Sequence, residues 1–279
     1  MKWMICADSS CDLRTEDIAC PEVGFETVPF SLRISGQEHV DEENMDISAM
    51  LTAMENCPEV CRSSCPAPEV WAQSYAKAEQ VLAITISSNL SGSYNSAVSA
   101  RNNVLEADPQ KKIAVLDSRS TGPESALCIT HMAHWIRQGH SMEEVQEKAQ
   151  AFLDQCKTIF ALCSFDNLVK NGRMGRFTGF IARTLGMWGI GIASDEGTII
   201  IKGKSKGAVR AIRLILDDMR DRGFTGGEVA ISHCMNEEMA EKLKEGILQH
   251  WHEASVRILS TRGLDSFYAE RGGLIVAYC

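Results

Sequence analysis

Short apolar segments typical of β-strands alternate with longer segments of helical spacing through the first half of the sequence. The strand-like segments are residues 3–7, 25–34, 80–86 and 111–118, and the helix-like segments are residues 45–57, 95–107, 126–138 and 141–156. Ser141 and Glu144 form a capping box at the start of the last helix. Strands joined through helices pair in parallel, and a parallel sheet is covered by helices on both faces. The alternation predicts an α/β fold.

Serine-rich loops follow three of the predicted strands, at residues 7–12, 87–93 and 116–122. In open α/β sheets, ligands bind beyond the carboxyl ends of the strands. Unpaired backbone N–H groups at a helix start, together with serine hydroxyls, suit an anion. A simple helix cap explains the middle loop equally well, because serine is a favoured N-cap residue. The convergence of all three loops favours an anion site.

The balance of charge and the N-terminal segment exclude several classes of protein. A formal net charge of −9 argues against a general nucleic-acid binder, which needs a basic face. The first apolar run stops at Asp8, too early for a secretory signal, and no apolar stretch is long enough to span a bilayer. We therefore expect a cytoplasmic protein whose eleven cysteines are reduced thiols.

The second half of the sequence begins near residue 158 and includes a basic, glycine-rich segment. Its predicted strands are residues 158–168, 198–207, 228–235, 256–261 and 272–279, and its predicted helices are residues 209–223 and 237–251. We interpret the chain as two α/β domains, residues 1–157 and 158–279. Because no repeat or low-complexity linker separates the two halves, we expect them to pack closely.

Two short motifs resemble those of enzymes but lack a required residue. Residues 203–205 read G-K-S, as in a P-loop, but the pattern needs a glycine where Thr198 stands. Residues 89–93 lack the first glycine of the G-x-S-x-G elbow of serine hydrolases. Neither a nucleotide site nor a hydrolase elbow is well supported.

Two other groups of residues have an ordinary explanation beside a functional one. Cys57, Cys61 and Cys65 recur at every fourth position, but without a C-x-x-C pair metal binding is improbable. Arg173 is either a surface charge or the partner of a buried carboxylate, which its planar guanidinium suits.

Six segments in order resemble the DegV family of bacterial fatty-acid-binding proteins, the acyl-carrying subunits of fatty acid kinase. They are ADSSCDL (7–13), RSSCPAPEVW (62–71), ISSNLSGSYNSA (86–97), VLDSRSTG (115–122), LVKNGRMGRFTGFIARTLG (168–186) and EGTIIIKGKSKG (196–207). The similarity covers essentially the whole chain. It implies two α/β domains of the DegV type, with an apolar tunnel for an acyl chain at their junction.

The resemblance also implies roles for individual residues. Ser63 and Ser91 would donate directly to the fatty-acid carboxylate, and Arg173 would support this network. The same pocket would be lined by Ser64, Ser88, Asn89 and Gly92. The turn with Lys204 and Lys206 corresponds to the contact with the kinase, which would supply the ATP site and the metal. We expect no catalytic residue, metal or cofactor in this chain.

One segment departs from the family pattern. Many members carry an H-x-G-P-G segment near the C-terminus, and its histidine joins the carboxylate network. Here residues 268–279 read YAERGGLIVAYC, so we expect Tyr268, Glu270 or Arg271 to take that place.

The sequence therefore predicts a cytoplasmic carrier that binds a long-chain fatty acid and presents its carboxylate to a partner kinase. One alternative is a serine-dependent esterase or acyltransferase that uses Ser88 or Ser91 and needs a general base nearby. Another is a sensor of small anions or nucleotides.

Overall fold

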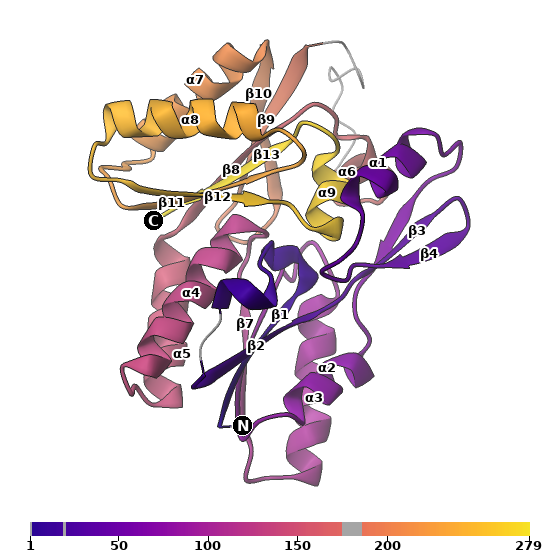
Figure 1. Ribbon diagram of the computed structural model, residues 1–279, viewed down its shortest axis with the longest axis vertical. Coiled ribbons are helices and arrows are strands. Elements are labelled where there is room, and N and C mark those ends of the chain that lie inside the picture. The colour runs from indigo at the N-terminus through magenta and orange to yellow at the C-terminus, as the bar shows by residue number, and fades with distance from the viewer. Residues whose placement is uncertain (1, 19–20, 175–185) are drawn as a thin grey trace.

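The structure is a computed structural model that describes residues 2–18, 21–174 and 186–279. Its N-terminal part contains a parallel sheet, as the sequence predicts, with four strands in the order β2-β1-β6-β7. The strands are β1 (Trp3–Asp8), β2 (Val23–Val28), β6 (Gln80–Thr85) and β7 (Lys112–Asp117). Helices cover both faces, with α2 (Pro68–Tyr75) and α3 (Ser93–Ala107) on one, and α4 (Pro123–Arg137) and α5 (Met142–Gln155) on the other (Figure 1).

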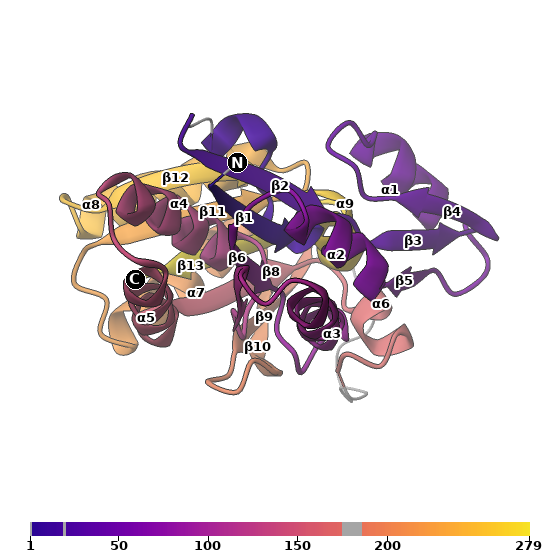
Figure 2. The same ribbon diagram turned by 90° about the horizontal axis from the view of Figure 1, so that it is seen from below.

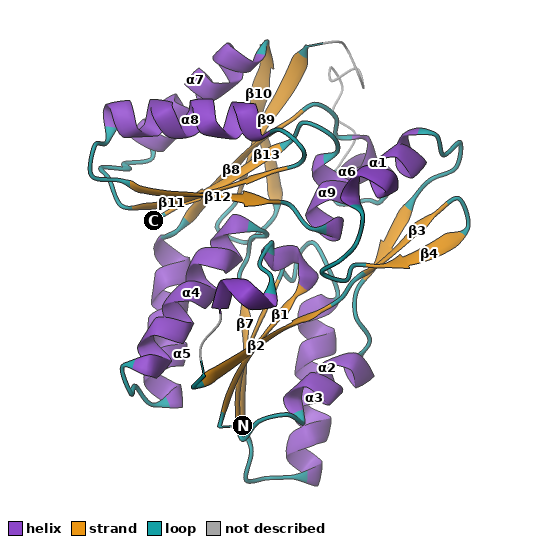
Figure 3. Ribbon diagram, in the orientation of Figure 1, coloured by secondary structure: helices purple, strands orange, loops and turns teal. Residues whose placement is uncertain are grey.

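The C-terminal part contains a six-stranded sheet of order β10-β9-β8-β13-β11-β12. Its strands are β8 (Lys157–Leu162), β9 (Met187–Ala193), β10 (Ile199–Lys206), β11 (Glu228–His233), β12 (Ser255–Ser260) and β13 (Leu274–Tyr278). The β11 and β12 strands pair in parallel, whereas the other pairs are antiparallel. Figure 3 shows α7 (Ala208–Asp221) and α8 (Glu237–His250) on one face of this sheet.

Successive residues of β8 show how the six-stranded sheet serves two cores. Ile159 and Ala161 pack against α7 and α8, whereas Phe160 and Leu162 belong to a different cluster on the opposite face. Alternate side chains of a strand point to opposite faces, so one strand contributes to both. The second face turns toward the N-terminal part of the molecule and bounds the cavity described below.

A three-stranded sheet of order β4-β3-β5 was not expected from the sequence. Its strands are β3 (Ser31–Ile34), β4 (Gln37–Val40) and β5 (Arg62–Ser64), and it projects beside α1 (Ile47–Glu55) (Figure 2). The predicted run 25–34 is divided at Pro29, which has no N–H to continue the ladder of β2. The β4 strand follows β3 directly, because Ser35 and Gly36 both take positive φ angles and form a tight hairpin turn.

The predicted strand 158–168 is too long. The strand ends at Leu162, and α6 (Asp166–Lys170) follows after Ser164 accepts a hydrogen bond from the Asp166 N–H at 3.1 Å. The short helix α9 (Gly263–Ala269) was also not predicted. No described helix has the length and apolar character needed to cross a membrane.

A disulfide joins Cys156 to Cys279. The antiparallel register pairs Lys157 of β8 with Tyr278 of β13, so the two cysteines are the next pair outward. Their Cα atoms are 4.3 Å apart. The expectation that all thiols are reduced is therefore wrong for this pair, while the eight other described cysteines are free. The domain boundary between residues 157 and 158, which directly follows the disulfide-bonded Cys156, remains a prediction.

Candidate functional site

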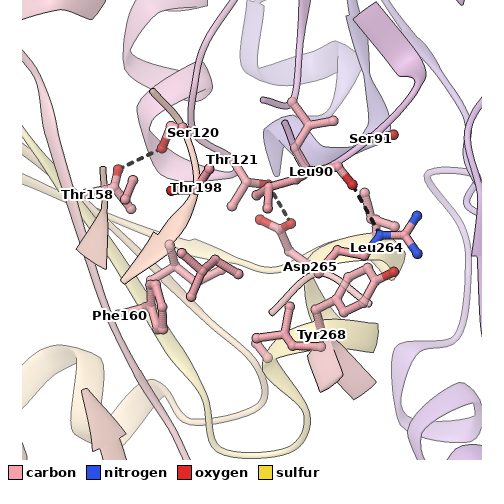
Figure 4. Close-up of a pocket in the computed structure, with 18 of the residues that line it drawn as sticks. Leu90, Ser91, Ser120, Thr121, Thr158, Phe160, Thr198, Leu264, Asp265 and Tyr268 are labelled. Atoms are coloured by element: carbon pink, nitrogen blue, oxygen red, sulfur yellow. Dashed lines mark hydrogen bonds between the residues drawn. The ribbon is translucent and has the colours of Figure 1, made fainter. Parts of the chain in front are cut away.

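A largely apolar cavity lies between the carboxyl ends of the parallel strands and the second face of the six-stranded sheet (Figure 4). It measures about 800 Å³, including the part that is open to solvent. The apolar part of its wall consists of Phe30, Ile86, Leu90, Phe160, Leu162, Leu168, Ala193, Ile199, Leu264, Ala269 and Ile275. Most of the surface exposed inside is apolar, so the cavity suits a hydrocarbon.

The helix α9 forms one wall, and a buried carboxylate fixes its position. Asp41 accepts hydrogen bonds from the N–H groups of Gly263 and Leu264, both at 2.8 Å. A Cβ atom at position 263 would lie 2.5 Å from Oδ1 of Asp41, so only glycine allows this approach. The N–H of Arg262 donates to Oδ1 of Asp12 at 2.8 Å. These bonds orient α9 so that Leu264, Asp265 and Tyr268 line the cavity.

Two buried carboxyl groups meet beside this wall. A Cβ atom at Gly122 would lie 2.4 Å from Oδ2 of Asp265 and 2.8 Å from Oδ2 of Asp12, so glycine is required there too. Burial raises the pKa of Asp12 to about 7. Burial, followed by the charge of Asp12, raises the pKa of Asp265 well above its ordinary value. We infer that Asp265, which accepts from the Thr121 hydroxyl at 2.8 Å, stays protonated at neutral pH and does not repel an anion in the cavity.

Hydroxyl groups gather at one end of the cavity. Ser63 Oγ and Tyr268 OH are 2.7 Å apart and hydrogen-bonded. Burial raises the pKa of Tyr268, so its phenol stays neutral. Because one hydroxyl of the pair donates to the other, the second O–H remains available to a ligand. Ser91 Oγ accepts from the N–H of Ser93 at 3.2 Å, which leaves its own O–H to donate as well.

Arg173 lies at the same end but does not meet a buried carboxylate in the described part of the structure. Its Nε donates to the carbonyl of Leu90 at 3.1 Å, and its Nη1 donates to the carbonyl of Asn171 at 2.6 Å. The guanidinium thereby holds the serine loop beside the cavity and brings a positive charge to its hydroxyl end. Ser63, Ser91, Arg173 and Tyr268 are thus brought together on the cavity wall.

Several of the residues implied by the resemblance lie elsewhere. Ser64 is exposed, because alternate residues of β5 point to opposite faces and Ser63 points inward. The N–H of Ser88 donates to Oδ1 of Asp117 at 3.1 Å, and neither it nor Gly92, which directly precedes α3, is part of the cavity wall.

Part of the serine loop instead joins the two halves of the molecule. Ser87 Oγ donates to the carbonyl of Gly197 at 2.6 Å, and Asn89 Nδ2 donates to the carbonyl of Glu196 at 2.6 Å. A Cβ atom at Gly197 would lie 2.3 Å from the Ser87 hydroxyl, so the turn between β9 and β10 fits closely on this loop. The surplus of polar groups noted in the sequence therefore serves an internal contact as well as the cavity.

Of the three residues expected to replace the family histidine, the structure places only Tyr268 in the cavity wall. Glu270 accepts from Ser164 at 2.9 Å, and Arg271 pairs with Glu55 at 3.0 Å. Both line a separate hollow, because the chain turns away from the cavity at the end of α9. Lys204 is exposed on β10, outside the cavity wall.

Polar residues toward the other end of the cavity were not predicted from the sequence. Ser120 donates to the hydroxyl of Thr158 at 2.9 Å (Figure 4). Thr158 in turn donates to Glu124 at 2.7 Å. Burial raises the pKa of Glu124 to about 7. Ser120 lies in the third serine-rich loop, which was a usable signal, whereas nothing local indicated Asp265. The described residues contain no group of three or more His, Cys, Asp or Glu side chains arranged to bind a metal.

Comparisons with known proteins agree with this geometry. The DegV family model, described as "Uncharacterised protein, DegV family", matches residues 2–278. A DegV domain-containing protein of Streptococcus pyogenes serotype M1 is 37% identical over 278 residues, which cover 100% of this chain and 99% of the relative.

Two solved structures are similar over nearly their whole length. The fatty acid kinase (Fak) B3 protein of Streptococcus pneumoniae, loaded with linoleic acid, is 36% identical with a TM-score of 0.96, and the match covers 100% of this chain and 99% of the other. A DegV family protein of Eubacterium eligens, loaded with heptadecanoic acid, is 32% identical with a TM-score of 0.93 and 98% coverage of both chains. The match over almost the whole sequence shows that this chain belongs to the DegV family.

Proposed function

We propose that this chain binds a long-chain fatty acid in the apolar cavity, with its carboxylate at the hydroxyl end formed by Ser63, Ser91 and Tyr268. The observation that carries the proposal is an apolar space with neutral O–H donors and Arg173 gathered at one end. The fatty acids bound to the similar proteins of S. pneumoniae and E. eligens support the same ligand class.

The energetics of burial fit this ligand. Each CH₂ group removed from water contributes about 0.8 kcal/mol, so a long acyl chain supplies roughly 10 kcal/mol before ordering costs. A carboxylate enters such a site only if donors replace its hydrating water. Ser63 or Tyr268 offers one O–H, Ser91 offers a second, and the guanidinium of Arg173 adds favourable charge.

We further propose that the bound carboxylate is presented to a partner kinase, which transfers a phosphoryl group to it. Neutral hydroxyl donors hold a carboxylate without protonating it, so an oxygen remains able to attack phosphorus. The exposed lysines Lys204 and Lys206 of β10 form the proposed contact surface for the kinase. This chain then acts as a non-catalytic carrier, and we place it in the cytoplasm, where such a kinase has ATP.

The alternative of a serine-dependent esterase has less support. A nucleophilic serine needs a general base within hydrogen-bonding reach. The described residues that line the cavity include no histidine, and Ser88 is not part of the wall. The carboxyl group of Asp265 is a poor base at neutral pH, because burial and the charge of Asp12 raise its pKa well above the ordinary value.

Mass spectrometry of the purified protein tests the proposal. Organic extraction should release a stoichiometric free fatty acid, whereas an acyl group covalently bound to serine would favour the esterase. Ser91→Ala should reduce the amount of co-purified fatty acid and leave the circular dichroism spectrum unchanged. The matched control is Ser64→Ala, which changes an exposed serine next to Ser63 and should retain the wild-type amount of fatty acid. A protein that carries no lipid and takes up none from solution would refute the proposal.

A further inference from the structure

A second hollow, separate from the apolar cavity, lies between α1, α6 and the segment that follows α9. It measures about 700 Å³, including open solvent, and its wall is mainly polar. Two cysteines line it, Cys57 just after α1 and Cys61 just before β5. The chain bends at Pro58 and Glu59, which turns the two cysteines toward each other. The proposed fatty-acid site does not use either of them.

The two thiols differ in environment although they are in contact. Cys57 is half-buried and accepts hydrogen bonds from the Ser35 hydroxyl and the Cys61 thiol, which lower its pKa. Cys61 is 5% exposed, and burial, followed by its hydrogen bond to Cys57, raises its pKa to about 11. Cys57 is therefore the more accessible thiol and the one whose pKa is lowered, whereas Cys61 is the more sheltered of the two. This is the arrangement of an attacking and a resolving cysteine.

The charges around the hollow indicate which oxidants can enter. Glu55 pairs with Arg271 at 3.0 Å, and Asp166 pairs with Lys170 at 3.6 Å, so these four charges cancel in pairs. Glu59 adds a carboxylate close to Cys57, and its carbonyl accepts from the Cys57 sulfur at 3.5 Å. Such a wall disfavours anions and admits a small neutral molecule.

We propose that Cys57 and Cys61 are a modification site, a thiol pair that hydrogen peroxide or a small organic hydroperoxide oxidises to a disulfide. The Cys57 thiolate attacks the peroxide, the O–O bond breaks, and Cys57 sulfenic acid forms with release of hydroxide, or of alkoxide from an organic hydroperoxide. The Cys61 sulfur then attacks the sulfenic sulfur, and its proton leaves with the hydroxyl group as water. The protein loses two electrons and the peroxide gains them. A dithiol reductant reverses the change.

The disulfide would form at a sensitive place in the fold. Cys61 is two residues before Ser63, and its carbonyl accepts from Asn171 Nδ2 at 3.1 Å, next to the segment that holds Arg173. Closing the Cys57–Cys61 pair fixes the start of β5, the strand that carries a hydroxyl of the proposed carboxylate site.

Peptide mapping of the full-length protein after treatment with hydrogen peroxide tests the proposal. Trypsin releases both cysteines in one peptide, residues 34–62, and Cys65 in the next, residues 63–77. After peroxide, the first peptide should be two hydrogens lighter and resist alkylation until a dithiol is added. The second peptide should remain fully alkylated, and the Cys156–Cys279 bond is read from other peptides.

Three variants assign the roles. Cys61→Ser should stop at a Cys57 sulfenic acid that dimedone traps, and Cys57→Ser should leave Cys61 reduced and alkylated. Cys65→Ser, which keeps the pair intact, should react like the wild type. Full alkylation of residues 34–62 after peroxide, or oxidation of Cys61 that persists in Cys57→Ser, would overturn the proposal.

Discussion

The carboxyl pair Asp12 and Asp265 makes the stability of this protein depend on pH, and Asp12→Asn tests the cause. Burial raises the pKa of Asp12 from 3.8 to about 7, so between these values the folded state binds more protons than the unfolded state. The free energy of unfolding must therefore fall as pH rises through this window. Asparagine does not titrate, keeps an oxygen to accept the N–H of Arg262, and offers an N–H₂ toward Asp265.

The size of the effect follows from the pKa shift. The pKa of Asp12 rises by roughly three, and each step of one corresponds to about 1.36 kcal/mol. Full ionisation of Asp12 therefore lowers the free energy of unfolding by at most about 4 kcal/mol, since the two carboxyl groups share their charge. Asp12→Asn should therefore be more stable than the wild type at about pH 8 and lose more than half of this advantage at about pH 5. Glu124, whose pKa burial also raises to about 7, leaves a residual pH dependence in the variant.

Urea unfolding at both pH values, followed by circular dichroism, measures the difference. The exposed carboxylate of Glu16 provides the control, because Glu16→Gln should leave the pH dependence as in the wild type. Equal destabilisation by Asp12→Asn at both pH values would show that the carboxyl pair is not the source of the pH dependence.

Three further changes should have distinct effects. Tyr268→Phe removes the partner of the Ser63 hydroxyl, so titration of delipidated protein with a fluorescent fatty acid should show weaker binding by roughly 1 kcal/mol; unchanged affinity would remove Tyr268 from the head-group site. Lys206→Glu should preserve fatty-acid binding and impair acyl phosphate formation with the kinase, and normal phosphorylation would exclude this surface. Replacing Cys156 and Cys279 together by serine should lower the free energy of unfolding by up to about 5 kcal/mol, since their bond closes a loop spanning 123 residues; a chevron or urea curve that matches the wild type would contradict this.

Local patterns were sufficient for much of the fold. The four parallel strands, and the helices α3, α4 and α5 that cover them, follow from strand-like and helix-like periodicity, because each of these segments buries residues set by its own sequence. The capping box of Ser141 and Glu144 is present as predicted, since both groups lie within one helical turn. The short motifs around Ser63 and Ser91 also identified residues that line the cavity.

Other features depend on partners that are distant in sequence. The β5 strand contains only three residues and exists because β3 pairs with it, so no periodicity marks it. Asp265 lines the cavity because Asp41 fixes α9 from more than two hundred residues away. The Cys156–Cys279 bond requires the register between β8 and β13.

The sequence by itself determined the α/β class, most of the long helices and strands, the serine-rich loops that follow the parallel strands, and the hydroxyl groups available to an anion. Only the tertiary structure decided which of those hydroxyls face the cavity and which join the two halves of the molecule. The physical reason is that periodicity records whether a side chain is buried, whereas the identity of its neighbour depends on how distant segments pack. Ser63 and Ser64 illustrate the difference, since neighbouring serines of one strand face opposite ways.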